Sequence, residues 1–193
     1  MLFRSETHPR QPINPYGASK AMAEALLADA AAAHGLRSVA LRYFNAAGAS
    51  DDACIGESHD PETHLVPNVL RAALGTGPGL QVFGDDWPTP DGTCIRDYVH
   101  VDDLAQAHAL ALDYMDAHPG AHAFNLGNGA GFSVRQVIAA AEAASGRAIP
   151  FSVQPRRPGD PAVLVAASDR ARRELGWAPE HATLAPILES ALR

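Results

Sequence analysis

A long alanine-rich run, followed by a glycine and a short β-prone segment, constrains the fold of this chain more than any other feature. Residues 16–34 predict a helix that ends at Gly35, and residues 37–44 predict a strand. A helix, a tight glycine turn and a strand form the repeating unit of a parallel α/β sheet. We therefore expect an α/β fold. The apolar stripe of the predicted helix comprises Tyr16, Ala23, Leu26, Leu27 and Ala30.

The remaining chain continues to alternate between the two element types. Ser133 is expected to cap one helix, and Asp102 and Asp103 are expected to start another. Polar loops are predicted at residues 50–63 and 155–161. The further predicted helices cover residues 64–74, 104–115, 134–144, 168–175 and 183–192, and the further predicted strands cover residues 80–84, 94–101, 123–127 and 149–153.

Composition excludes several classes of protein. The 193 residues are 47% hydrophobic and 19% charged, which is enough to bury a core in one domain or two small ones. The net charge of -7 argues against a nucleic-acid-binding or anionic-membrane-binding protein. The sequence contains no apolar run of about 18 residues and begins without the apolar core of a signal peptide, so we expect a cytoplasmic protein with no membrane partner.

The cysteines and histidines give no metal-binding pattern that we recognise. Cys54 and Cys94 do not combine with the nine histidines at a spacing typical of zinc sites. Two cysteines in a cytoplasmic chain are more often free thiols than a disulfide. We therefore expect no metal site.

Tyr16 and Lys20 form a candidate catalytic pair. Residues four apart share a helix face, so the lysine ammonium can favour the phenolate form of the tyrosine. A free tyrosine has a pKa of about 10, and proton transfer near neutrality requires roughly 4 kcal/mol of phenolate stabilisation. One lysine rarely supplies that much, whereas the oxidised nicotinamide of NAD would add a second positive charge. The spacing also occurs by chance, so a structural role for both residues stays open at this point.

Six motifs follow one another in a specific order: NPYGASK at 14–20, LRYFN at 41–45, VFG at 82–84, DGTCIRDYVHV at 91–101, NLG at 125–127 and RRPGD at 156–160. Together they resemble the extended short-chain dehydrogenase/reductase family and, within it, the UDP-glucose 4-epimerases. The resemblance runs along essentially the whole chain. It implies a partial Rossmann-like parallel sheet plus a small α/β substrate-binding domain.

The resemblance also implies a reaction and a cofactor. Members of this family hold NAD tightly, oxidise C4 of the hexose in UDP-glucose or UDP-galactose, and reduce the ketone on its other face. Tyr16 matches the residue that takes the C4 hydroxyl proton, and Lys20 matches the residue that binds the nicotinamide ribose. Tyr43 matches a position beside the nicotinamide. In the alternative interpretation, Tyr43 and Phe44 are core residues at a strand end.

Several positions match the family's UDP-hexose site. Phe44 and Asn45 match contacts with the sugar and diphosphate, and His64 and Leu65 match a diphosphate loop. The family's uracil site is matched by Gln81 and Phe83, its diphosphate and uridine ribose site by Arg96, Arg157 and Asp160, and its gate for N-acetylated sugars by Leu164. Guanidinium groups suit phosphates, and a carboxylate accepts hydrogen bonds from ribose hydroxyls. A solvated loop is the alternative for the two arginines.

The sequence departs from the family pattern at its front. It has no strand followed by Gly-x-x-Gly-x-x-Gly, the expected NAD pyrophosphate turn, because the glycines of 125–131 have the wrong spacing. The family's catalytic Ser or Thr is also unmatched, since Ser5 lies too close to Tyr16. We expect residues 1–48 to be a remnant of an NAD-binding domain, and residues 49–193 to be mainly a sugar-nucleotide-binding domain, with 100–130 returning to the Rossmann sheet.

On this interpretation the chain is a truncated form that binds NAD poorly and has little activity alone. Two alternatives stay open: a nucleotide-sugar dehydratase or decarboxylase of the same superfamily, and a non-catalytic UDP-sugar-binding fragment. Family members often dimerise through the helix that carries the catalytic tyrosine, so a homodimer is carried over by analogy.

Overall fold

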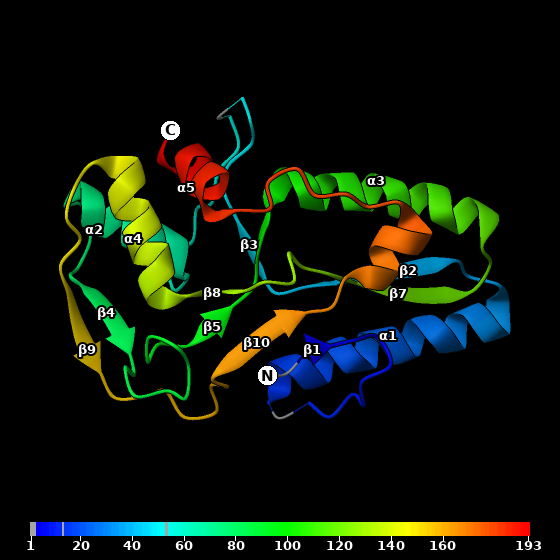
Figure 1. The fold of residues 1–193 in the computed structure, drawn as a ribbon. Helices are drawn as coiled ribbons and strands as arrows, with labels where there is room; N and C mark the ends of the chain where they lie inside the picture. The colour runs from blue at the N-terminus through cyan, green and yellow to red at the C-terminus, as the bar shows by residue number, and fades with distance from the viewer. Residues whose placement is uncertain (1–2, 13, 53) are drawn as a thin grey trace.

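The computed structural model describes residues 3–12, 14–52 and 54–193 as an α/β structure (Figure 1). The helices are α1 (Pro15–His34), α2 (Leu65–Leu74), α3 (Val101–Ala117), α4 (Val134–Ser145) and α5 (Leu184–Leu192), with a π-helical turn, η1 (Ala171–Leu175). The strands are β1 (Phe3–Arg4), β2 (Ser38–Tyr43), β3 (Asn45–Ala47), β4 (Leu80–Phe83), β5 (Ile95–Arg96), β6 (Tyr98–His100), β7 (Ala121–Leu126), β8 (Phe132–Ser133), β9 (Phe151–Gln154) and β10 (Val163–Ala166). In these ranges, no helix has the length and hydrophobicity needed to cross a membrane.

The strands pair mainly in parallel, which confirms the expected fold class. β2 pairs with β7, β3 with β6, β4 with β9, and β10 with both β1 and β5, all in parallel. β8 is the exception, because it runs antiparallel to β5. In Figure 1, α3 lies on one side of the β2–β7 pair and α1 on the other, as in a sheet with helices on both faces.

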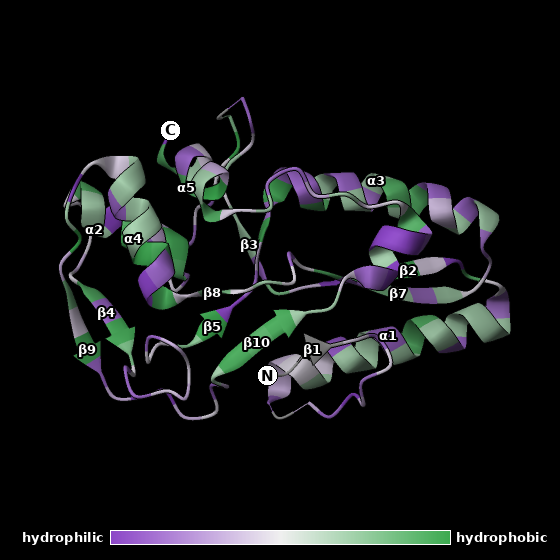
Figure 2. Ribbon diagram, viewed as in Figure 1, coloured by the Kyte–Doolittle hydropathy of each residue, from purple (hydrophilic) through white to green (hydrophobic). Residues whose placement is uncertain are grey.

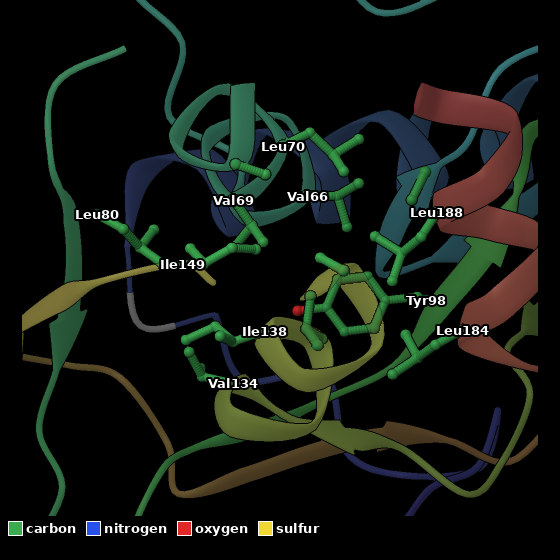
Figure 3. Packing of buried hydrophobic residues seen from close by; sticks show 14 of the residues in the cluster. Val66, Val69, Leu70, Leu80, Tyr98, Val134, Ile138, Ile149, Leu184 and Leu188 are labelled. Atoms are coloured by element: carbon green, nitrogen blue, oxygen red, sulfur yellow. The ribbon is translucent and has the colours of Figure 1, made fainter. Parts of the chain in front are cut away.

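Two clusters of buried apolar side chains hold these elements together. The first lies between β2, β7 and α3 and includes Phe124, Leu126 and Trp177, each at most 1% exposed. The second packs α2, α4 and α5 around the ring of Tyr98 (Figure 3). Because side chains alternate along a strand, β6 directs Tyr98 into the second cluster and Val99 into the first. One short strand therefore connects the two cores.

The N-terminal helix begins and ends as its sequence predicts, but its packing face differs from the predicted stripe. The Asn14 side chain accepts a hydrogen bond from Gly17 N at 2.8 Å, and Gly35 ends α1 in the left-handed conformation that favours glycine. Leu27 is half-buried, whereas Tyr16 is 73% and Leu26 69% exposed. The predicted stripe is therefore wrong for these two residues, because a polar contact of Glu24, described below, turns another face toward β2.

Other boundaries also differ from the expectation. α3 begins at Val101, and the side chain of His100 caps it by accepting a hydrogen bond from Asp102 N at 3.2 Å. Asp102 and Asp103 consequently occupy the first turn instead of preceding it. The apolar strand β10, which stands out in Figure 2, was not predicted. It is four residues long, and its partners β1 and β5 are two residues each, too short to give a periodic signal.

Ser133 forms a reciprocal cap at the start of α4, as predicted. Its Oγ accepts a hydrogen bond from Gln136 N at 3.1 Å, while its own N donates to Gln136 Oε1 at 2.8 Å. Ser133 Oγ also donates to Asp91. Ser133→Ala is expected to lower the free energy of unfolding by about 1–2 kcal/mol, measured by urea denaturation. Ser152→Ala, on the exposed side of β9, is the control; equal losses in the two variants would contradict the capping role.

Candidate functional site

The Tyr16–Lys20 pair opens onto a cavity of about 520 Å³ between α1 and β2. Lys20 Nζ lies 5.3 Å from the centre of the Tyr16 ring. Tyr43 and Phe44, which lie at and just beyond the end of β2, line the same cavity. The structure thus brings together four residues that the sequence singled out.

The fold places these side chains where parallel α/β sheets usually bind ligands. Tyr43 is the last residue of β2, so the cavity lies at the carboxyl end of that strand. Asn14 and Pro15 fix the first turn of α1, which holds Tyr16 at the rim. Ser5, which the sequence did not match to a catalytic position, also lines the cavity, and its hydroxyl hydrogen-bonds that of Thr7 at 2.9 Å.

An ion-pair network that the sequence did not reveal forms part of the cavity wall. Arg42 Nε donates to Glu24 Oε1 at 2.8 Å, a second Arg42 nitrogen contacts Glu24 Oε2, and Arg10 Nη1 reaches that oxygen at 3.0 Å. The hydrogen bond from Arg42 lowers the pKa of Glu24, and Glu24 in turn raises the pKa of Arg42. The pair fixes the rotation of α1 against β2. An arginine within a short strand was the available signal.

A second group of predicted residues meets around Asp160. Arg96 Nη2 lies 3.7 Å and Arg157 Nε 3.5 Å from Asp160 Oδ2. The Arg157 guanidinium lies 4.6 Å from the centre of the Phe83 ring, and the register of β10 on β5 sets Leu164 opposite Arg96. Arg96 is held by the carbonyl oxygens of Ile95 and Pro161, both at 2.9 Å, whereas the Arg157 side chain is 58% exposed. The group offers cations, a carboxylate and an aromatic face.

The other predicted residues have different surroundings. Gln81 is exposed on the same side of β4 as Phe83. Asn45 Nδ2 donates to the carbonyl oxygen of Asp97 at 2.7 Å. His64 contacts Glu57 and Glu62 just before α2, and Leu65 packs against the second core. Asn45, His64 and Leu65 therefore spend their observed contacts elsewhere than on the Asp160 group.

Asp97 has a positioning role that the sequence did not assign. Its carboxylate is fully buried and accepts backbone hydrogen bonds from Asn128 at 2.9 Å, Gly129 at 3.2 Å and Ala166 at 3.1 Å. Burial raises the pKa of Asp97, and these backbone hydrogen bonds oppose the shift. Asp97 thereby ties the loop after β7 to the end of β10, beside Arg96. A carboxylate flanked by apolar strand residues was the signal in the sequence.

Comparison with known proteins extends these observations. The chain is 53% identical over 186 residues to a UDP-glucose 4-epimerase of Lacticaseibacillus casei, covering 96% of this chain and 56% of the relative. A UDP-glucose 4-epimerase of Azospirillum brasilense is also 53% identical, over 97% of this chain and 54% of its own length. The chain thus spans about half the length of the curated relatives that it matches.

Solved structures agree. The UDP-glucose 4-epimerase of Brucella ovis in complex with NAD matches with a TM-score of 0.95 and 48% identity, over 100% of this chain and 59% of that one. The enzyme of Bifidobacterium longum in complex with NAD+ and UDP matches with a TM-score of 0.92 and 42% identity, over 100% and 58%. These matches confirm the Rossmann-like α/β assignment.

The match to a whole protein family decides the affiliation. The NAD dependent epimerase/dehydratase family matches residues 3–127, a range that includes the Tyr16–Lys20 pair, both ends of the cavity wall and the Arg96–Asp97 segment. The resemblance carried by the six sequence motifs is confirmed. Sequence, fold and site geometry agree that this chain belongs to the NAD dependent epimerase/dehydratase family.

Proposed function

We propose that the protein containing this chain interconverts UDP-glucose and UDP-galactose through an NAD-dependent 4-keto intermediate. The observation that carries the proposal is the convergence of Tyr16, Lys20, Tyr43 and Phe44 on one cavity. The relatives named above are UDP-glucose 4-epimerases, and two structural relatives hold NAD. The reaction would belong to galactose metabolism in the cytoplasm.

The cavity suits the nicotinamide end of NAD. Its volume of about 520 Å³ falls within the range of small-molecule sites. Lys20 offers an ammonium donor for a ribose hydroxyl, and Tyr43 offers an aromatic edge at the end of β2. When bound, NAD would supply a hydride acceptor and donor, which no side chain can provide.

The side chains of this chain would handle the proton. Tyr16 Oη would accept the proton of the C4 hydroxyl when the sugar is oxidised and return one when the ketone is reduced, as a general base and then a general acid. Lys20, one helical turn away, would stabilise the phenolate. Phe44 and Asn45 are proposed to contact the sugar and diphosphate. Rotation of the ketone between the two steps would change the face that receives the hydride.

The Asp160 group would hold the UDP moiety. Arg157 and Arg96 would bind the diphosphate, Asp160 the uridine ribose, and Phe83 with Gln81 the uracil. His64 and Leu65 are proposed as further diphosphate contacts, and Leu164 as the gate near the sugar.

A binding experiment tests the UDP site independently of catalysis. Arg157→Ala is expected to weaken the binding of UDP by 10–100-fold in calorimetry, because a charge-assisted contact with phosphate contributes about 1.5–3 kcal/mol. Arg156→Ala is the matched control: it removes the same charge one residue away, from a guanidinium held by Asp86 and Trp87. Equal weakening by both variants would show general charge attraction instead of a site.

A turnover experiment tests the whole proposal. The complete protein that contains these 193 residues is incubated with UDP-galactose and NAD, and the products are separated. UDP-glucose is the expected product. Loss of water or carbon dioxide from the nucleotide sugar would favour a dehydratase or decarboxylase, and UDP binding without turnover would favour a binding protein.

A homodimer is part of the proposal. Met22 and Leu26, 65% and 69% exposed on α1, supply an apolar surface outside the cavity wall that a second copy could cover. Light scattering after size-exclusion chromatography would measure the mass, and a monomer at all concentrations would contradict this part.

A further inference from the structure

Four potential metal ligands gather in the loop that leads into α2. They are Glu57, His59, Glu62 and His64, and the ligand atoms that they offer all lie within 4.8 Å of one another. Of these residues, only His64 belongs to the proposed UDP-hexose site. The sequence analysis searched for cysteine-containing patterns and passed over this short spacing of two histidines and two glutamates.

The two imidazole rings converge on one carboxylate oxygen. His59 Nδ1 lies 3.0 Å and His64 Nδ1 2.5 Å from Glu57 Oε1. The ring centres are 4.9 Å apart, in an edge-to-face arrangement. Glu62 Oε1 completes the group at 3.3 Å from His64 Nδ1. Two nitrogen ligands and two carboxylate oxygens therefore face a common centre.

Glu62 provides an independent indication of a cation. Its side chain is only 1% exposed. Oε1 accepts a hydrogen bond from His64 N at 2.8 Å, but Oε2 is buried and has no hydrogen-bond partner in the described part of the chain. A buried carboxylate oxygen without a partner is costly, and a metal ion bound to that carboxylate would remove much of the cost.

We propose that Glu57, His59, Glu62 and His64 form a binding site for a divalent transition-metal ion of the zinc class. Tetrahedral zinc with nitrogen and oxygen ligands at about 2.0–2.2 Å places those ligands roughly 3.3 Å apart, close to the separations found here. Imidazole ligands favour zinc, nickel or copper over magnesium and calcium, and two carboxylates match the charge of a divalent ion.

The frame of the site is already built into the fold. Asn68, one turn into α2, donates from Nδ2 to the carbonyl oxygens of His64 at 2.9 Å and Glu62 at 3.4 Å. Such contacts hold the ligand-bearing backbone in place. A metal ion on His64 Nδ1 would fasten the loop to α2 and leave Nε2 as the protonated nitrogen of that ring.

The test uses the 193-residue protein after treatment with a chelator, titrated with Zn²⁺ in calorimetry and with Co²⁺ in visible spectroscopy. One ion per chain is expected, with the visible absorption of tetrahedral Co²⁺. Glu62→Gln and His59→Asn should each weaken binding at least about 10-fold. The His59 side chain is 58% exposed, so its replacement should leave the fold intact, which circular dichroism can verify.

Two controls separate this site from other ligands on the chain. Cys54 is an exposed thiol near the loop, and Cys54→Ser should leave the Zn²⁺ affinity unchanged. His34→Asn, at the exposed end of α1, removes a histidine outside the cluster and should also have no effect. The proposal is overturned if the wild type binds no stoichiometric ion, if either control variant accounts for the binding, or if Glu62→Gln and His59→Asn bind as tightly as the wild type.

Discussion

Asp97→Ala is expected to lower the free energy of unfolding by at least about 3 kcal/mol, the largest effect on stability that the structure predicts. The substitution leaves three backbone N–H groups, of Asn128, Gly129 and Ala166, without their buried acceptor. Each unsatisfied donor costs about 1–3 kcal/mol. The space also matters, because a Cβ added at Gly127 would lie 2.5 Å from Asp97 Oδ2, so this loop is fitted closely around the carboxylate.

Urea denaturation followed by circular dichroism measures the loss. Asp29→Ala, at an exposed position of α1, is the matched control and should change stability by less than about 0.5 kcal/mol. Asp97→Asn keeps one acceptor oxygen but presents an amide group to N–H donors, so it should also destabilise the chain. If Asp97→Ala were no worse than the control, the three hydrogen bonds could not be what holds this loop.

The pH dependence of the same comparison has a definite sign. Burial raises the folded-state pKa of Asp97 above its value in the unfolded chain, so the folded state binds this proton more tightly. The contribution of Asp97 is therefore complete below the unfolded pKa and declines as the pH rises through the folded pKa. The difference in stability between wild type and Asp97→Ala should be larger near pH ~4 than near pH ~7.

The sequence predicts features whose causes are local. Asn14, Gly35 and Ser133 determine helix ends through contacts within a few residues, and the structure confirms all three. The alternation of helix and strand likewise predicted a mainly parallel sheet. These features need no knowledge of distant partners, because caps and periodicity act over one or two turns.

Features that depend on distant partners were missed. The rotation of α1 depends on Arg42 reaching Glu24, 18 residues earlier. The role of Asp97 depends on backbone groups as far away as Ala166, 69 residues later. Four of the predicted cavity and UDP-site residues could be singled out only because motifs of a family supply the long-range pairing that periodicity cannot. The roles proposed for these residues stay predictions that kinetics must test.

Tyr16→Phe is expected to have the largest effect on activity. In the complete protein supplied with NAD and UDP-galactose, it should lower kcat by about 10²–10⁴-fold, the usual contribution of a general acid or base. The KM should change by no more than a few-fold, because the phenol would act on the reacting hydroxyl while the Asp160 group would bind the UDP moiety. Tyr16 is 73% exposed, so removal of its hydroxyl should not disturb the fold.

The control is Tyr114→Phe, since Tyr114 stacks on His118 in α3, outside the lining of the cavity. Its kcat should equal that of the wild type. A Tyr16→Phe enzyme that retains most of its kcat would contradict the acid–base role, whereas an unchanged kcat with a raised KM would make Tyr16 a binding residue. Lys20→Met distinguishes further: if Lys20 stabilises the phenolate, its loss should shift the pH at which kcat/KM rises toward higher values, because more base is then needed to ionise Tyr16.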